Sequence, residues 1–249
     1  MNGTSAGSRV TRVAMWSGPR NLSTALMRSW ENRPDTAVLD EPFYAHYLDH
    51  TGLDHPVAAR VIEAGPVEEA RAIARCLADP AGGETVSYQK HMAHHLLPGM
   101  DRSWLDLVHN VLLVRHPARV LASYVKKREV VTLTDLGLPQ QLELLDRLRE
   151  RAPVLDSDEF LTDPPAHLER LCAHVGIDFD PSMLAWPAGE RSSDGVWADH
   201  WYDAVRASTG FGPAPLGPLP ELPDEMTDLL DRAIEIYDQV RLRGQRLMD

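Results

Sequence analysis

The sequence predicts an α/β fold: a three-layer sandwich with a central, mostly parallel sheet of about five strands flanked by helices. Two observations lead to this prediction. Short runs of continuous apolar residues are typical of strands that are buried on both faces, as in a parallel sheet. Segments with apolar residues at helical spacing alternate with those runs, so the chain should form βαβ units with right-handed crossovers. The composition is that of a globular protein, with 43% hydrophobic residues among 249.

Each element follows from a local pattern. In chain order, strands are expected at 13–16, 37–39, 85–88 and 111–114, with a fifth and less apolar candidate at 153–156. Apolar residues spaced by three and four predict the helices between and after them. These helices cover 25–30, 67–77, 120–124, 142–148, 167–175 and 222–240, and the last has the longest apolar stripe.

Residues 1–249 are expected to form one domain, since nothing like a linker divides the middle of the chain. Residues 1–10 are mostly small and polar, and we expect them to be flexible. Residues 210–223 contain five prolines and three glycines, a composition that excludes regular structure. This stretch is interpreted as a connector to the C-terminal helix.

The charge and cysteine content exclude several classes of protein. With 25 Lys and Arg against 37 Asp and Glu, the net charge of −12 disfavours binding to nucleic acid or to an anionic membrane. Cys76 and Cys172 lie in helical segments without metal-ligand spacing and are interpreted as buried thiols. No signal-peptide-like stretch is visible, and no apolar run is long enough to cross a bilayer. We therefore expect a cytoplasmic protein without a bound metal, and assembly into a homo-oligomer stays open.

A candidate anion site follows the first strand, where V-A-M-W-S-G-P-R-N-L-S-T places a strand, a tight loop and a helix in immediate succession. The N–H groups and partial positive charge of a helix N-terminus attract phosphate. Gly18 permits a close approach of the backbone, and Arg20 adds a cation. The structural alternative is a helix capped by Asn21 or Ser23. The candidate phosphate-binding residues of this loop are Ser17, Gly18, Pro19, Arg20, Asn21, Leu22, Ser23 and Thr24.

A second candidate site follows the fourth strand, in L-L-V-R-H-P-A-R-V-L-A-S-Y. Arg115 leaves the strand end and Ser123 lies about two helical turns beyond it, so the two side chains can grip one phosphate from two sides. The structural alternative is an arginine at a sheet edge and a buried serine. Taken together, the two elements indicate a ligand with two separated phosphate groups.

The two elements resemble motifs of the PAPS-dependent sulfotransferase family, whose donor is 3′-phosphoadenosine 5′-phosphosulfate (PAPS), and the C-terminal part is similar to a bacterial sulfotransferase-like subgroup. P-R-N-L-S-T is similar to the motif P-[KR]-S-G-T-[ST], with Asn21 and Leu22 in place of Ser and Gly. The second motif, R-x-P-x-x-x-x-x-S-x-[YF], matches at Arg115, Pro117, Ser123 and Tyr124. The resemblance implies a P-loop-like fold and transfer of a sulfuryl group from PAPS to a hydroxyl or amine of a small molecule. It also implies that Arg20 neutralises the leaving phosphate and that no metal is required.

Two residues are candidates for the general base that deprotonates the acceptor. Glu41 follows the second strand in L-D-E-P-F-Y, a region in which some members of the family use a glutamate. His91 lies seven residues before the proline of L-L-P, an offset similar to that of the catalytic histidine in cytosolic members. The structural alternatives are that Glu41 caps the next helix or forms an ion pair with Arg20, and that His91 is a surface or merely hydrogen-bonded histidine. A metal site formed by His91, His94 and His95 is a further alternative.

Three other functions account for part of the sequence. The tripeptide R-H-P at Arg115 suggests a histidine phosphatase, although that family has R-H-G near its N-terminus. A P-loop-like kinase or nucleotide hydrolase needs Gly and Lys where Asn21 and Leu22 stand. A sulfotransferase-like protein could also bind the nucleotide without catalysis. The acceptor cannot be read from the sequence, but residues 44–67 suggest a lid over it. Aromatic candidates for its pocket are Trp16, Phe43, Tyr44, Tyr47, Trp197, Trp201, Tyr202 and Phe211.

Overall fold

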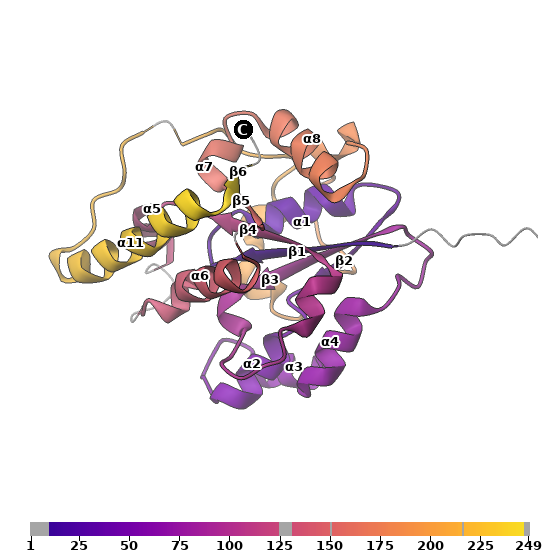
Figure 1. The fold of residues 1–249 in the computed structure, drawn as a ribbon, viewed down its shortest axis with the longest axis horizontal. Coiled ribbons are helices and arrows are strands. Elements are labelled where there is room, and N and C mark those ends of the chain that lie inside the picture. The colour runs from indigo at the N-terminus through magenta and orange to yellow at the C-terminus, as the bar shows by residue number, and fades with distance from the viewer. Residues whose placement is uncertain (1–9, 125–130, 150, 216, 247–249) are drawn as a thin grey trace, which may run out of the picture.

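A six-stranded sheet forms the centre of the protein in the computed structural model, which describes residues 10–124, 131–149, 151–215 and 217–246 (Figure 1). Its strands follow the order β2-β3-β1-β4-β5-β6, and every neighbouring pair is parallel. The strands are β1 (Thr11–Ser17), β2 (Thr36–Asp40), β3 (Val86–Met92), β4 (His109–Val114), β5 (Pro153–Asp156) and β6 (Gln245–Arg246).

The predicted fold class is confirmed, and all five expected strands are present. β3 continues to Met92, four residues beyond its expected end, because Gln89, Lys90 and His91 are buried despite their polarity. The apolar pattern does not predict β6, which has only two residues.

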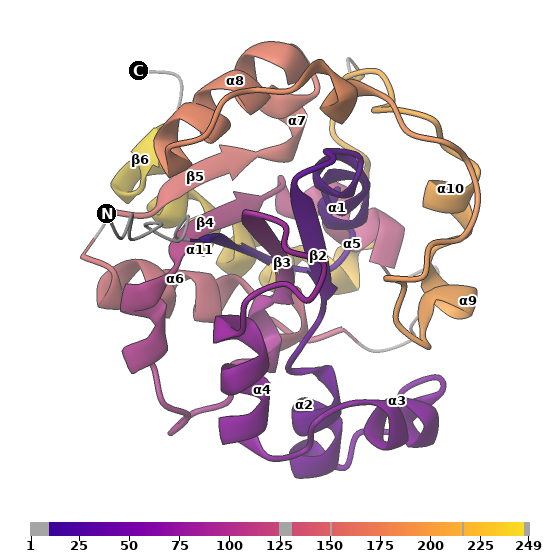
Figure 2. The ribbon, with the colours of Figure 1, turned by 90° about the vertical axis from the view of Figure 1, so that its right-hand side faces the viewer.

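Helices cover both faces of the sheet. One apolar cluster joins the sheet to α1 and α8, and a second cluster joins the opposite face to α4, α5, α6 and α11. α2 and α3 pack against each other and lie beside α4 in both views (Figures 1 and 2). The helices are α1 (Ser23–Glu31), α2 (Tyr44–Thr51), α3 (Ala58–Ala64), α4 (Glu69–Leu77), α5 (Pro117–Tyr124), α6 (Leu138–Arg147), α7 (Ser157–Phe160), α8 (Pro164–Val175), α9 (Ala198–Trp201), α10 (Asp203–Arg206) and α11 (Thr227–Arg243).

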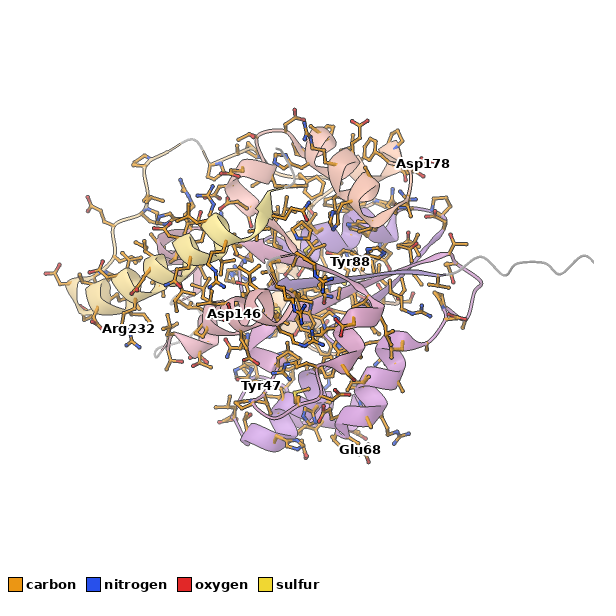
Figure 3. All side chains as sticks on the ribbon, in the orientation of Figure 1. Tyr47, Glu68, Tyr88, Asp146, Asp178 and Arg232 are labelled. Carbon is orange, nitrogen blue, oxygen red and sulfur yellow. The ribbon has the colours of Figure 1, made fainter. Side chains whose placement is uncertain are left out.

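Buried apolar side chains pack around the sheet, and polar side chains lie at the periphery of the protein. Tyr88 of β3 lies in the interior, stacked on Trp30 with ring centroids 5.0 Å apart, whereas Glu68 and Arg232 lie at the surface (Figure 3). Cys76 and Cys172 are free and buried, as predicted. None of the described helices is both long enough and apolar enough to span a membrane.

The position of β1 determines where a ligand can bind. β1 pairs with β3 on one side and with β4 on the other, so that Ser17 at its end lies opposite Met92 and Leu113. From β1 the chain continues to β2, which lies on one side of β1 in the strand order. Later it passes from β3 to β4, which lies on the other side of β1. Ligands of open parallel sheets bind at such a reversal, beyond the carboxyl ends of the strands. The candidate phosphate loop lies at this point.

Candidate active site

The loop after β1 presents an uncapped helix N-terminus. β1 ends at Ser17, α1 begins at Ser23, and the residue at the cap position is Leu22, which makes no side-chain hydrogen bond to the helix. The alternative of a helix capped by Asn21 or Ser23 is therefore wrong. Instead the Asn21 amide donates a hydrogen bond to the carbonyl oxygen of Leu113, 2.6 Å away. The first N–H groups of α1 thus receive no capping side chain and are available to bind an anion.

Gly18 allows this loop to pass close to a neighbouring segment. A Cβ atom at position 18 would lie 2.1 Å from the carbonyl oxygen of Leu136, a clash that backbone atoms cannot avoid by rotating. Only glycine fits here.

Three residues of the candidate site have a left-handed backbone that side chains disfavour. The φ angles are 59° at Arg20, 67° at Leu22 and 40° at Glu41. A non-glycine residue in this conformation costs on the order of 1–3 kcal/mol, and such residues cluster at functional sites. Arg20 and Leu22 follow β1 and Glu41 follows β2, so all three lie at the carboxyl edge of the sheet.

The two predicted phosphate elements meet in the structure. The Nε of Arg20 donates a hydrogen bond to Ser123 Oγ at 3.0 Å, and Nη1 of Arg115 donates to the carbonyl oxygen of Arg20 at 3.1 Å. Burial, and then repulsion by the nearby Arg115, lowers the pKa of the Arg20 guanidinium. Arg115 and Arg119 pair with Asp158, whereas no described carboxylate pairs with Arg20. Three neighbouring arginines with one paired carboxylate favour an anionic ligand.

Two polar residues that sequence reasoning missed hold the loop in place. Ser157 Oγ contacts the carbonyl oxygens of Asn21 at 3.1 Å and Val114 at 2.8 Å. The Gln141 amide donates to the carbonyl oxygens of Trp16 and Leu113. A signal for Ser157 exists, because it directly follows the fifth strand at the same edge of the sheet. For Gln141, which lies within α6, we find no signal.

Glu41 belongs to a buried charge network that the sequence does not reveal. The Nζ of Lys90 forms an ion pair with Glu41 Oε1 and lies 3.0 Å from Asp40 Oδ1 and 2.7 Å from the hydroxyl of Tyr202. Glu41 therefore pairs with Lys90, and the alternative pair with Arg20 is absent among the described contacts. Burial raises the pKa of the Glu41 carboxyl, and the charge of Lys90 opposes this shift. No described residue donates a hydrogen bond to the second oxygen, Oε2.

The same carboxylates raise the pKa of Lys90. Burial alone would lower it, but Asp40 and Glu41 raise the pKa well above its ordinary value, so the ammonium stays charged. The charged ammonium of Lys90 therefore orients the Glu41 carboxylate and offsets its negative charge.

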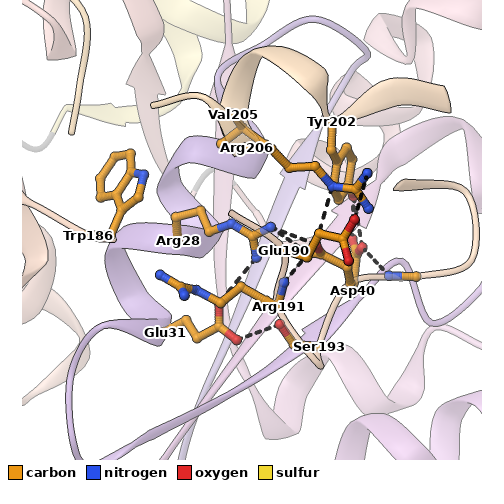
Figure 4. Close-up of polar contacts among 12 residues, drawn as sticks. Arg28, Glu31, Asp40, Trp186, Glu190, Arg191, Ser193, Tyr202, Val205 and Arg206 are labelled. Atoms are coloured by element: carbon orange, nitrogen blue, oxygen red, sulfur yellow. Dashed lines mark hydrogen bonds and ion pairs between the residues drawn. The ribbon is translucent and has the colours of Figure 1, made fainter. Parts of the chain in front are cut away.

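The segment 192–202 completes this network from far along the chain. Tyr202 donates to Asp40 at 2.8 Å, and the Gly195 N–H donates to the same carboxylate at 3.2 Å (Figure 4). Arg28 of α1, which is 1% exposed, pairs with Asp194 at 2.6 Å. These contacts fasten the segment to both α1 and β2.

His91 is buried beside Trp16, the residue that directly precedes the loop. Its ring is 1% exposed and stacks on Trp16, with centroids 4.1 Å apart, and its Nε2 contacts Gln89 Oε1 at 3.1 Å. Burial, and then the charge of Lys90, lowers the pKa of His91 to about 3. It points to the face of β3 opposite Lys90, so its position does not support the predicted role as a base in contact with an acceptor.

The other two histidines of that segment pack elsewhere. His95 stacks on Tyr44 and Tyr47 with centroids 4.7 Å apart in both cases, and His94 lies edge-on to Tyr47. Among the described residues, no group of three His, Cys, Asp or Glu side chains is placed to hold a metal ion.

A cavity of about 250 Å³ lies beyond the end of β2. Of the predicted aromatic candidates, only Trp197 lines it, while most of the others are buried in the core. Residues 44–67, predicted as a lid, contain α2 and α3. The cavity is lined by Val38, Leu39, Asp40, Glu41, Pro42, Ala45, Val61, Ala64, Gly65, Pro66, Arg75, Ser192, Ser193, Asp194, Gly195, Val196 and Trp197.

The fold and the loop together define a three-layer, P-loop-like α/β protein with a candidate anion site after β1. Residues 11–244 match the family model described as Sulfotransferase domain. The chain therefore belongs to the sulfotransferase family.

Solved sulfotransferase domains share this fold at low sequence identity. The sulfotransferase from Alicyclobacillus acidocaldarius is 15% identical, with a TM-score of 0.58 over 94% of this chain and 97% of that one. The sulfotransferase domain from the curacin biosynthetic pathway is 16% identical, with a TM-score of 0.56 over 96% and 100%. That of the Synechococcus PCC 7002 olefin synthase is 17% identical, with a TM-score of 0.52 over 94% and 98%.

Two curated proteins of Arabidopsis thaliana are more similar in sequence. Branched-chain-amino-acid aminotransferase-like proteins 1 and 2 are 34% and 32% identical to the chain over 232 residues. The match covers 92% of this chain but only 41% of either relative.

Proposed function

We propose that the protein transfers a sulfuryl group from PAPS to a hydroxyl or amine of a small acceptor by in-line displacement. The observation that carries this proposal is the meeting of Arg20, Arg115 and Ser123 at the uncapped N-terminus of α1. Membership of the sulfotransferase family supports the same chemistry.

The chain's own residues fit such a donor. The N–H groups at the start of α1, with Ser23 and Thr24, suit the 5′-phosphosulfate. Arg115 and Ser123 suit the 3′-phosphate, because a guanidinium and a hydroxyl both donate hydrogen bonds to phosphate oxygens. Arg20, which no described carboxylate neutralises, offsets the charge that builds on the leaving phosphate.

In the proposed step, Glu41 accepts the proton of the acceptor group through its open oxygen, Oε2. The acceptor oxygen or nitrogen forms a bond to sulfur while the bond from sulfur to the phosphate oxygen breaks. The electron pair leaves with 3′-phosphoadenosine 5′-phosphate. β3 lies between β1 and β2 in the sheet. The loop after β1 and Glu41 after β2 are therefore roughly 10 Å apart, which is twice the spacing of neighbouring strands. The transferring group and the acceptor can occupy that gap.

The name of the Arabidopsis relatives does not extend to this chain. It describes proteins of which the match covers only 41%. The residues of the candidate site do not indicate an aminotransferase activity. The alternatives kept from the sequence are nucleotide binding without transfer and a P-loop-like kinase or hydrolase.

Two measurements separate these functions. Calorimetry with 3′-phosphoadenosine 5′-phosphate and with ATP compares the two classes of nucleotide, and we expect binding of the first at least tenfold tighter. Mass spectrometry after incubation with PAPS and a mixture of alcohols, phenols and amines then detects a sulfated product. Tighter binding of ATP would favour the kinase or hydrolase, and nucleotide binding without any sulfated product would favour the catalytically inactive alternative.

A further inference from the structure

The cavity beyond β2 has the position and size of a site for a small acceptor. Glu41 lines it, and so does the segment 192–197 that is fastened to α1 and β2. Its volume of about 250 Å³ is below the roughly 300–1,000 Å³ typical of pockets for drug-sized ligands. It therefore suits a compact molecule.

Every carboxylate that lines this cavity already has a cation behind it. Asp40 and Glu41 share Lys90, which is buried. Asp194 pairs with Arg28. Each of these carboxylates therefore has a cationic partner within the protein, and Lys90 offsets one of the two negative charges of Asp40 and Glu41.

Arg75 is the exception among the charged residues of the cavity wall. It lies in the last turn of α4 and is exposed, and no described residue forms a hydrogen bond or an ion pair with it. A cation near a helix C-terminus stabilises the helix by itself. That effect explains a positive charge in this turn, but it does not explain why the side chain forms part of a cavity whose other charged residues all have ion-pair partners.

On the basis of the proposed function, we infer that the acceptor is a small hydroxy or amino compound that carries an anionic group such as a carboxylate. Arg75 binds the anionic group, and the reacting hydroxyl or amine points to Glu41 at the other wall. The apolar residues between them, among them Val38, Val61 and Val196, contact the body of the molecule.

The test compares ligands that share a hydroxyl and a similar carbon skeleton but carry a negative, neutral or positive group at the other end. One set is hydroxyphenylacetate, methylphenol and tyramine, all with the hydroxyl in the para position; a narrower set is 4-hydroxybutanoate, butan-1-ol and 4-aminobutan-1-ol. Binding is measured by ligand-observed NMR, with and without 3′-phosphoadenosine 5′-phosphate. In at least one set we expect the anion to bind about fivefold more tightly than the neutral compound, equivalent to about 1 kcal/mol, the upper range for an exposed charge pair. Arg75→Gln should abolish this preference, and Arg75→Glu should reverse it in favour of the amine.

Two further variants control for indirect effects. Arg71→Glu alters the same helix outside the cavity, where Arg71 pairs with Glu68, and should leave the order unchanged. Ala64→Trp places a large ring at an exposed position of the wall and should weaken all the ligands alike.

The outcome separates this inference from the proposed function. If no ligand of either set binds, or if the order is the same in wild type and Arg75→Glu, the anionic acceptor is wrong even when the nucleotide binds. If the ligands follow the charge at position 75 but the nucleotide does not bind, the cavity assignment holds and the sulfuryl-transfer proposal fails.

Discussion

Arg115 donates a hydrogen bond from Nη1 to the carbonyl oxygen of Arg20, 3.1 Å away, so the cation that follows β4 supports the loop that follows β1. The second candidate phosphate element is thus also a structural support for the first. This coupling leads to a prediction for donor binding.

Replacing Arg115 by Met should weaken the binding of 3′-phosphoadenosine 5′-phosphate by tenfold to about a hundredfold, since one charge-assisted contact contributes about 1.5–3 kcal/mol. Calorimetry measures the change. Arg147→Met removes a surface pair with Asp106 and serves as the matched control. A loss of less than twofold in Arg115→Met would remove this residue from the proposed site.

Leu22 has a left-handed backbone at a position where the related motif has glycine, with φ at 67°. Glycine adopts this conformation without steric cost, whereas alanine does not. Both Leu22→Gly and Leu22→Ala lose the packing of the leucine side chain, so their difference isolates the backbone. We expect the glycine variant to be more stable by about 0.5–1 kcal/mol in urea unfolding. Ala25→Gly, inside α1, should have the opposite sign.

The rate of sulfuryl transfer should fall as the pH drops through the pKa of Glu41, because a base must be deprotonated to act. Burial raises that pKa above its ordinary value of 4.5, so the fall should occur above pH 4.5. Lys90→Met removes the opposing positive charge and should move the fall to higher pH, whereas Lys90→Arg retains the charge and should restore it. Glu41→Gln should abolish the pH-dependent phase. An unchanged profile in both Lys90→Met and Glu41→Gln would show that another group is the base.

His91 should make the protein sensitive to acid. Its folded-state pKa of about 3 lies below the ordinary 6.5, so the unfolded chain takes up a proton first as the pH falls. The stability that neutral, buried His91 contributes is therefore fully present above pH 6.5. It decreases below that pH by about 1.4 kcal/mol per pH unit. Urea unfolding at pH 7.5 and pH 5.5 measures the loss. His91→Phe preserves an aromatic ring against Trp16 and should reduce the loss by about 1.4 kcal/mol. An equal loss in His91→Phe and in the wild type would contradict this assignment.

The pair of Arg28 and Asp194 should be costly to break from one side only. Both side chains are buried, at 1% and 5% exposed, and removing Arg28 would leave the Asp194 carboxylate with the more distant Arg206, 4.0 Å away, in place of a cation at 2.6 Å. Arg28→Met should destabilise the protein by about 3–5 kcal/mol in urea unfolding. The double variant Arg28→Met/Asp194→Leu should recover most of this loss. If it did not, packing and not charge would account for the effect.

The fold and the strand–loop–helix geometry after β1 could be predicted because both leave local signals. Four strands are continuous apolar runs, and the loop residues from Ser17 to Thr24 are consecutive in the chain. Arg115 and Ser123 share one short motif. The pairing of that motif with Arg20 follows from parallel strands, whose carboxyl ends meet at one edge of the sheet.

The network around Glu41 could not be predicted in the same way. Asp40, Lys90 and Tyr202 come together only because β3 lies beside β2 and because a distant segment folds back over both. No local pattern encodes that order of strands. His91 illustrates the same limit, because its offset from a proline says nothing about which face of β3 it occupies.

The central place of β1 has a consequence for how the protein acquires its structure. The first strand of the chain pairs with segments about 75 and 100 residues later, at Trp16 with His91 and Ser17 with Leu113. During synthesis the apolar strand β1 therefore has neither neighbour until β3 has left the ribosome, and it lacks the second one until β4 follows. Topologies dominated by such distant pairings fold slowly and expose aggregation-prone edges on the way. Substitutions that weaken β3 or β4 should therefore lower the yield of folded protein more than their effect on equilibrium stability implies.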